Sequence, residues 1–160
     1  MLSHKLQLED VEEDYLLIAI HSSVEEYKIA YYLNKFLQIG LKRSAVDVDF
    51  NHGTIQASYP LFYFKEKDKY RSFFLVKNKH RGAVKKVVSS GSLFIEEEEN
   101  SRSTYLIPEH KDVDYFLKIE DDSSLKEREL LQQIASIPNI ITSYSIDPNI
   151  LKSKNNLIFE

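Results

Sequence analysis

Residues 14–20 read Asp-Tyr-Leu-Leu-Ile-Ala-Ile, and residues 114–120 read Asp-Tyr-Phe-Leu-Lys-Ile-Glu. Each stretch is followed by a pair of serines, at 22–23 and 123–124, and then by a segment with helical periodicity. Each helical segment leads into an alternating apolar segment, at 45–49 and at 144–147. The repetition predicts two copies of one strand-helix-strand unit.

The two helical segments carry their own start and stop signals. Two Ser-x-x-Glu pairs have the spacing of a capping box, which predicts a helix start; they are Ser23 with Glu26 and Ser124 with Glu127. Gly40 and Pro138 are expected to end the helices. The apolar positions on one helical face are Ile29, Leu33, Phe36 and Leu37 in the first helix, and Leu130, Leu131, Ile134 and Ala135 in the second.

Two such units bury their helices most economically on one face of a shared antiparallel sheet. We therefore predict an α+β fold of ferredoxin-like, duplicated type, formed by one domain over residues 1–160. The first unit covers residues 14–50 and the second covers 113–147. A β-rich insertion occupies 51–112, and 148–160 form a C-terminal tail.

The insertion is expected to hold a hairpin of residues 59–64 and 70–76 around the turn 65–69. A second ribbon is expected from residues 93–95 and 104–107, with a connector at 79–91 that carries a short helical turn. The hairpin has large apolar side chains on both faces, including Phe62, Phe64, Phe73 and Phe74. Two interpretations are open: burial under a second layer of the same chain, or an interface of a two-fold homodimer.

Residues 107–115 read Ile-Pro-Glu-His-Lys-Asp-Val-Asp-Tyr. The segment contains every fixed letter of the motif I-P-E-x-x-x-V-D-Y, and the chain resembles the small bacterial IPExxxVDY family named for it. The resemblance implies membership but no activity. The candidate motif residues are Glu109, Asp112, Asp114 and Tyr115, and they are interpreted either as a structural joint between two strands or as a ligand or partner site.

Metal and cofactor chemistry have weak support in the sequence. His110, Asp112 and Asp114 alternate along the chain, and a second group contains Asp47, Asp49 and His52, but neither group has a signature spacing for a divalent ion. The four glycines, at 40, 53, 82 and 91, are not grouped as in a phosphate-binding loop. We expect no metal site, no cofactor and no catalytic residue.

Composition favours a compartment, and we expect no membrane anchor. The 160 residues contain no cysteine, which favours the reducing cytoplasm. The first residues turn acidic instead of apolar, unlike an export signal, and the longest apolar run, Tyr15–Ile20, is too short to span a bilayer. The net charge is −4, but residues 64–86 carry nine cations against two anions.

These features leave three hypotheses for function. We expect a non-catalytic module that binds a small ligand or a protein, as ferredoxin-like regulatory domains do. The alternative is nucleic-acid binding through the basic hairpin at 59–86, where Tyr63, Tyr70, Phe62 and Phe73 lie among lysines and could stack on bases. The third is an enzyme that uses the acidic segment 109–114, although the sequence offers no activating partner.

Overall fold

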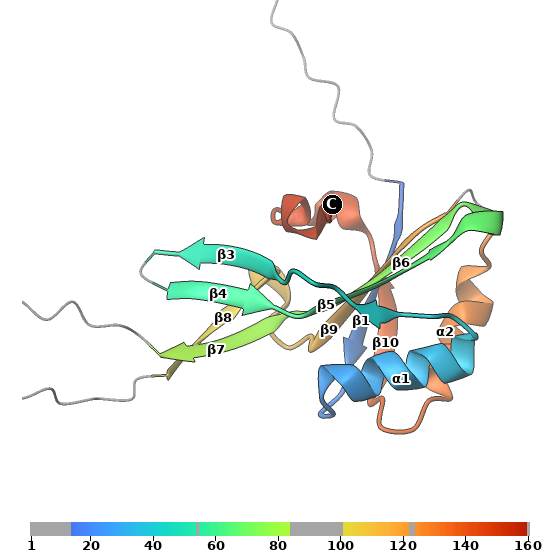
Figure 1. Cartoon of the computed structure of the whole chain (residues 1–160), viewed down its shortest axis with the longest axis horizontal. Coiled ribbons are helices and arrows are strands. Elements are labelled where there is room, and N and C mark those ends of the chain that lie inside the picture. Colours follow the sequence, from blue (N-terminus) through green and yellow to red (C-terminus); the bar gives the residue numbers. More distant parts are fainter. Residues whose placement is uncertain (1–13, 54, 84–100, 122–123, 160) are drawn as a thin grey trace, which may run out of the picture.

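The computed structural model of the chain describes residues 14–53, 55–83, 101–121 and 124–159. In this part of the chain, ten strands and two α-helices form an α+β fold whose strand pairs are antiparallel (Figure 1). The main sheet has the order β10-β1-β9-β6-β5-β2. Its strands are β1 (Leu16–His21), β2 (Lys42–Arg43), β5 (Leu61–Glu66), β6 (Arg71–Lys77), β9 (Tyr115–Glu120) and β10 (Thr142–Ile146). The α+β class and the mostly antiparallel sheet are confirmed, whereas the ferredoxin-like duplication stays a prediction.

The two Asp-Tyr strands lie side by side at the centre of this sheet. β1 and β9 pair antiparallel, so that Leu16 is opposite Ile119 and Ile20 is opposite Tyr115. β10 pairs with the other side of β1. β1 therefore lies between β9 and β10, the two strands of the predicted second unit.

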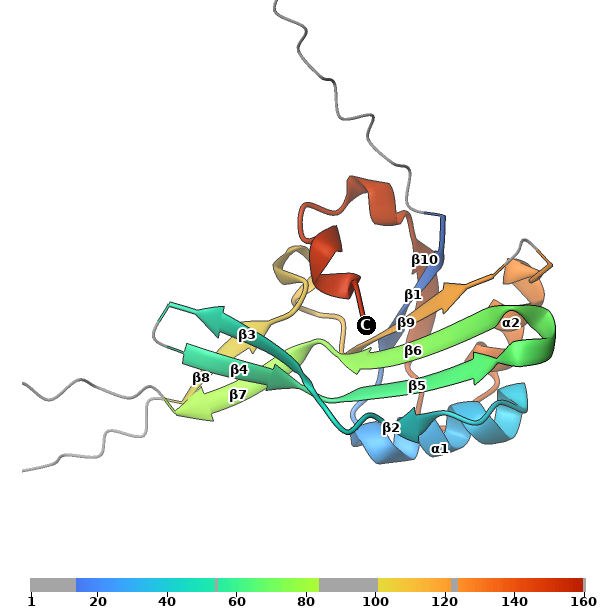
Figure 2. The ribbon, with the colours of Figure 1, turned by 45° about the horizontal axis from the view of Figure 1, so that its top comes forward.

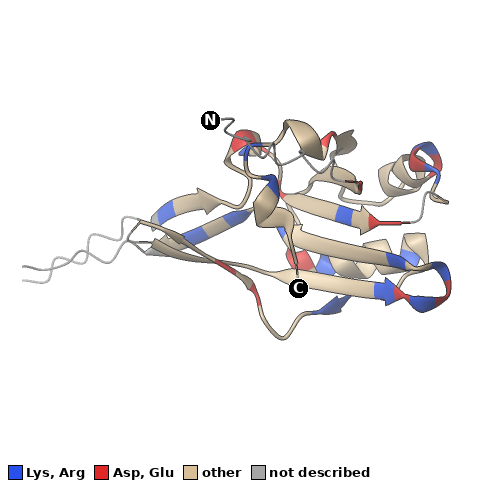
Figure 3. Ribbon diagram, turned by 90° about the horizontal axis from the view of Figure 1, so that it is seen from above, with Lys and Arg blue, Asp and Glu red and all other residues tan. Residues whose placement is uncertain are grey.

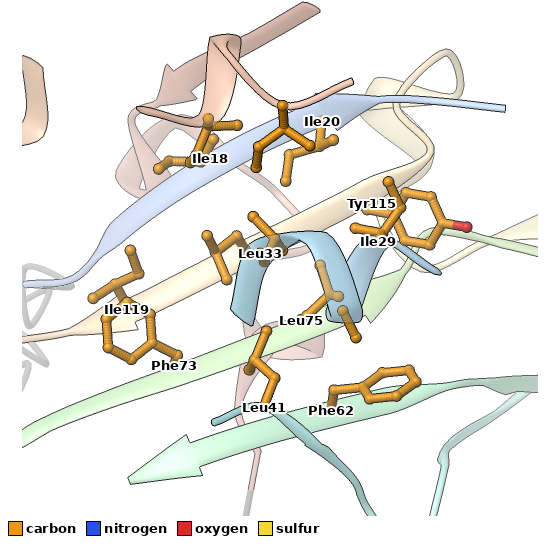
Figure 4. Close-up of a cluster of buried hydrophobic side chains, with 14 of the residues drawn as sticks. Ile18, Ile20, Ile29, Leu33, Leu41, Phe62, Phe73, Leu75, Tyr115 and Ile119 are labelled. Carbon is orange, nitrogen blue, oxygen red and sulfur yellow. The ribbon is translucent and has the colours of Figure 1, made fainter. Parts of the chain in front are cut away.

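Both helices cover one face of the sheet, and all of their predicted apolar residues except Ala135 are buried or partly buried against it. α1 (Glu26–Leu37) and α2 (Glu127–Ala135) pack beside each other. Leu33 and Ile134 are fully buried in the same cluster, and Figure 4 shows Leu33 above the side chains of β1 and β6. Leu131 is partly buried there, whereas Ala135 is exposed. The position and facing of the helices were thus predicted correctly.

The capping boxes were wrong. α1 begins at Glu26 and α2 at Glu127, and neither N-cap residue makes a side-chain cap hydrogen bond. Ser22 instead donates its hydroxyl to the carbonyl of Asn139 at 2.6 Å. Before α2, the Asp121 carboxylate accepts the amide of Leu125 at 2.6 Å. The Asp121 carboxylate therefore organises the start of α2, and the Ser22 hydroxyl ties the segment before α1 to Asn139. These contacts take the place of the caps predicted at Ser23 and Ser124.

The end of α1 also differs from the prediction. The residue in the left-handed conformation is Gln38, with a φ of 53°, and not Gly40. The side chain of Asn34 then fixes the following loop, because it accepts the amide of Leu41 at 2.7 Å and donates to the Leu41 carbonyl at 2.9 Å. Gly40 has another role: a Cβ atom there would lie 3.3 Å from the ring of Phe64.

The return strand of the first unit is displaced from its expected place at 45–49. Only the two residues of β2 reach the main sheet, at its far edge beside β5. The next strand, β3 (Val48–His52), pairs with β4 (Ile55–Tyr59) in a separate sheet. β6, which belongs to the insertion, occupies the position beside β9. The inserted hairpin has longer and more apolar strands, and it occupies the two positions between β9 and β2.

Two ribbons extend from one end of the sheet (Figure 1). One is β3–β4, and the other pairs β7 (Lys79–Ala83) with β8 (Ser101–Tyr105). The buried hydroxyl of Tyr59 joins the ribbons, since it contacts Thr104 at 3.2 Å and His52 at 3.0 Å. The partner of β8 was predicted at 93–95, a segment outside the described residues, but β8 pairs with β7. The connector with a helical turn was predicted to begin at residue 79, where the structure has the strand β7.

The C-terminal tail covers the second face of the sheet (Figure 2). It contains two short 3-10 helices, Pro148–Ile150 and Lys154–Leu157. Leu151 and Leu157 are buried there with residues of β1, β6 and β9, so that the sheet has a core on each face. In the part of the chain that the structure describes, neither helix has the length and apolar character to cross a bilayer.

Candidate functional site

A cleft of about 600 Å³ opens on the tail-covered face of the sheet. We call it the tail groove. Its lining residues are Ser44, Ala45, Val46, Asp47, Val48, Leu61, Tyr63, Lys65, Phe74, Ile158 and Phe159. Val46 and Ile158 line the groove and are nevertheless 68% and 60% exposed. Apolar side chains are thus presented to solvent around an apolar hollow.

The base of the groove comes from the inserted hairpin. Tyr63 of β5 and Phe74 of β6 lie directly opposite each other. Because side chains alternate along a strand, both point away from the helices. The ring of Phe159 packs against Phe74 with their centroids 5.4 Å apart. The C-terminal segment and the central hairpin are therefore in direct contact along this groove.

Lys118 holds the C-terminal side of the groove in place. It lies on the central strand β9 and is only 5% exposed. Its ammonium donates to the carbonyl of Leu157 at 2.8 Å and lies 3.1 Å from the carboxylate of Glu120. It also lies within 6 Å of three ring centroids, those of Tyr15, Phe74 and Phe159. One buried cation thus fastens the tail to the sheet.

The opposite side of the groove is the segment 44–48, which links the two sheets. The amide of Ser44 donates to the carbonyl of Leu61 at 2.8 Å. Arg43 and Asp47 form an ion pair across one turn of this segment. These contacts fix the backbone at both ends of the segment and leave Val46 projecting at its middle, exposed to solvent.

In the described part of the chain, the groove has one cation outside the ion pair that its single carboxylate forms. Among its described lining residues, the charged side chains are Asp47 and Lys65. Asp47 is already paired with Arg43, whereas Lys65 is exposed at the groove margin. A second ammonium, that of Lys42, lies 5.5 Å from the centroid of the Tyr63 ring. The site is therefore suited to an apolar molecule that carries one anionic group.

The motif segment 107–115 lies elsewhere, where the main sheet meets the ribbons. Its centre is Asn78, which is fully buried. The Asn78 side chain donates to the carbonyls of His110 and Val113 at 2.8 and 2.9 Å, and accepts the amide of Ile107 at 2.8 Å. One side chain therefore satisfies three backbone groups of the motif, which the sequence did not reveal.

The four candidate motif residues are not brought together, and none lines the tail groove. Glu109 binds Ser153 of the tail, through the amide at 3.1 Å and the hydroxyl at 2.6 Å. Asp114 accepts the amide of Ser22 at 2.8 Å. Asp112 is exposed. These contacts are those of a structural joint.

Tyr115 has the largest electrostatic perturbation in this region. Its hydroxyl donates to the carbonyl of Val24 at 2.6 Å. Burial raises the pKa of Tyr115, and the nearby carboxylates of Glu26 and Asp114 raise it further. The phenol therefore stays neutral and serves as a hydrogen-bond donor that ties the start of α1 to β9.

The metal-ligand hypotheses have no geometric support in the described residues. No group of three or more His, Cys, Asp or Glu side chains lies close enough there to hold an ion. His52 contacts the hydroxyl of Tyr59, and Asp49 accepts the hydroxyl of Ser58 at 2.6 Å. The acidic and histidine residues of β3 thus have different partners.

The aromatic residues of the hairpin are largely internal. Phe62 and Phe73 are buried beneath the helices, and Phe74 is buried on the tail face. Phe64 is half-buried and stacks on Phe73. The sequence left two interpretations of these side chains open, and the structure agrees with burial within the same chain.

The basic hairpin does not form a continuous cationic surface among the described residues. Arg71 pairs with Asp121 at 3.0 Å, and Lys77 pairs with Glu26 at 3.3 Å. Figure 3 shows acidic residues beside the basic ones at the hairpin end. Of the aromatic residues considered for base stacking, Tyr70 is 85% exposed, while Phe62 and Phe73 are in the core.

Comparison with protein-family models, curated proteins and solved structures finds no match to this chain. The resemblance to the IPExxxVDY family therefore stays a prediction that rests on residues 107–115 alone.

Proposed function

We propose that the chain is a non-catalytic binding module, and that its tail groove takes a small apolar ligand with one anionic group. The observation that carries the proposal is the groove itself, whose volume of about 600 Å³ lies within the range of small-molecule sites. Such sites are mostly apolar and contain a few polar groups that orient the ligand.

The lining residues favour a ligand with an apolar body and one anionic group. An aliphatic or aromatic body would lie on Tyr63 and Phe74, and would bury the exposed side chains of Val46 and Ile158. A carboxylate or sulfonate would lie at the margin, within reach of Lys65. This arrangement favours amphipathic acids over neutral sugars or free metal ions.

Binding accounts for the groove better than catalysis does. A serine nucleophile needs an adjacent base, and the groove's described lining residues include neither histidine nor cysteine. The hydroxyl of Ser44 already contacts the amide of Val46 at 3.3 Å. The cysteine-free composition still favours the cytoplasm as the compartment.

The test uses 8-anilinonaphthalene-1-sulfonate, a fluorescent aromatic anion, as the probe. The folded chain should bind the probe with saturable fluorescence, and aliphatic or aromatic carboxylates should displace it. Val46→Asp places a carboxylate at the groove margin and should abolish most of this binding. Lys65→Gln should weaken it by about two- to fivefold, the value of one exposed ion pair.

Lys67→Gln is the matched control, because Lys67 lies in the same hairpin, two residues after Lys65, but does not line the groove. It should bind the probe like the unaltered chain. Circular dichroism checks that each variant keeps its fold. Probe fluorescence that is unchanged by Val46→Asp and Lys65→Gln, in folded variants, would overturn the proposal.

A further inference from the structure

The two edges of the main sheet differ in a way that ligand binding does not explain. These edges are β10 and β2, the first and last strands in the order of the main sheet. The β2 edge has two residues, Lys42 and Arg43, and both are charged and exposed. Short strands with cations are a common protection against edge-to-edge pairing. This edge is therefore closed to further strands.

The β10 edge has none of these protections. Its five residues read Thr-Ser-Tyr-Ser-Ile and include no charge, no proline and no glycine. In the part of the chain that the structure describes, β10 pairs only with β1, so its outer side is open to a further strand. An uncharged edge of this length is a ready site for β-strand addition.

Apolar side chains also lie exposed along this edge. Tyr144, at the middle of β10, is 36% exposed and hydrogen-bonds His21 at 3.0 Å. Ile141 directly precedes the strand and is 75% exposed, and Ile150 follows it and is 71% exposed. The edge thus has an aromatic centre with an exposed isoleucine beyond each end.

We propose that β10 pairs antiparallel with β10 of a second copy, across a two-fold axis at Tyr144, so that one sheet continues through both copies. A two-fold axis places identical residues opposite each other at the centre. An uncharged strand makes this possible without like-charge repulsion. In the antiparallel pair, Ile141 of one copy lies at the C-terminal end of β10 of the other copy. Ile150 of that other copy follows the same end of its strand. This self-complementarity favours a second copy over a foreign peptide.

Single cysteines test the pairing directly, because the natural chain contains none. Opposite residues of an antiparallel pair have Cβ atoms about 4.5–5.5 Å apart, close to the spacing that a disulfide needs. Tyr144→Cys should therefore form a cross-linked dimer under mild oxidation. Tyr70→Cys, a more exposed site on the central hairpin, should not form the cross-link under the same conditions.

Sedimentation provides a second measurement that needs no cross-link. The unaltered chain should sediment as a dimer at micromolar concentration, and Ser145→Lys should weaken the dimer by about threefold or more, because the two ammonium groups then lie diagonally across the two-fold axis on the same face of the sheet and repel each other. Tyr70→Lys should leave the dimer intact. A monomeric natural chain, a dimer that Ser145→Lys does not weaken, or cross-linking that is no faster at 144 than at 70 would each overturn the proposal.

Discussion

The side-chain oxygen of Asn78 accepts the backbone amide of Ile107 at 2.8 Å, in a site from which solvent is excluded. The same side chain donates to two carbonyls of residues 110–113. Asn78→Ala would leave all three backbone groups without this partner. Since each unsatisfied buried group costs about 1–3 kcal/mol, we expect the free energy of unfolding to fall by about 3 kcal/mol or more, measured by urea denaturation.

Asn156→Ala is the matched control for this substitution. Asn156 makes one side-chain hydrogen bond, to the carbonyl of Leu106 at 2.8 Å, in the same region. Its loss should cost about 1 kcal/mol. Equal costs for the two variants would show that Asn78 does not have the special role we assign to it.

The contact of Glu109 with Ser153 should make stability depend on pH. Burial raises the pKa of Glu109, but the hydrogen bonds from Ser153 and the neighbouring backbone outweigh it and leave the pKa below its ordinary value. The charged form is thus favoured in the folded state. Its stabilisation is present above the unfolded pKa of about 4.3, and it is lost as the pH falls through the lower folded pKa.

A double-mutant cycle of Glu109→Gln and Ser153→Ala measures this effect. Because Glu109 is exposed, we expect a coupling of only about 0.5 kcal/mol at neutral pH, decreasing as the pH falls through the lowered folded pKa. Urea denaturation at neutral and at acidic pH provides the four free energies of the cycle at each pH. A coupling that grows on acidification would contradict the assigned direction of the pKa shift.

The helical face of the sheet should be sensitive to cavities. Leu33 and Ile134 are both fully buried, so their replacement by alanine should lower the free energy of unfolding by about 2–5 kcal/mol. Gln132→Ala, on the exposed side of α2, should change it by less than about 0.5 kcal/mol. Small effects at both buried positions would mean that the helices are not packed as described.

Local periodicity explains which parts of the fold could be predicted. The segments of β1, β9, α1 and α2 each carry the apolar periodicity of their secondary structure. Two repeated units that share one core also predict the antiparallel pairing of β1 with β9. The hairpin of β5 and β6 has a clear turn between two apolar runs. The return strand was misplaced because alternation at 45–49 defines a strand but not the sheet that it joins.

The tail groove could not be predicted, because its lining residues come from four separate parts of the sequence. Its base and its two sides meet only when the tail folds back over the sheet. One signal was present: Lys118 interrupts the apolar run of β9 at a position that faces the second core. A cation at such a position indicates a buried polar partner, although not which segment provides it.

Lys118 links the core to the groove, so we expect its replacement to loosen the tail. Lys118→Met keeps an unbranched apolar side chain among the three aromatic rings but removes the donor to the carbonyl of Leu157. Replacing a buried cation by an apolar group of similar shape is often nearly neutral for global stability. We therefore expect the local effect to dominate: amide exchange in residues 151–159 should rise by about tenfold, the equivalent of one lost hydrogen bond.

The measurement is hydrogen exchange by mass spectrometry, with peptides from β1 and β9 as the internal reference. Those peptides should exchange as in the unaltered chain, whereas the tail peptide should lose protection. Probe affinity for the tail groove should fall with it, because Phe159 forms part of the lining. Lys126→Met, which removes an exposed ion pair with Glu129, should alter neither quantity. Unchanged tail exchange in Lys118→Met would show that the aromatic contacts alone hold the tail, and that the ammonium is dispensable for the groove.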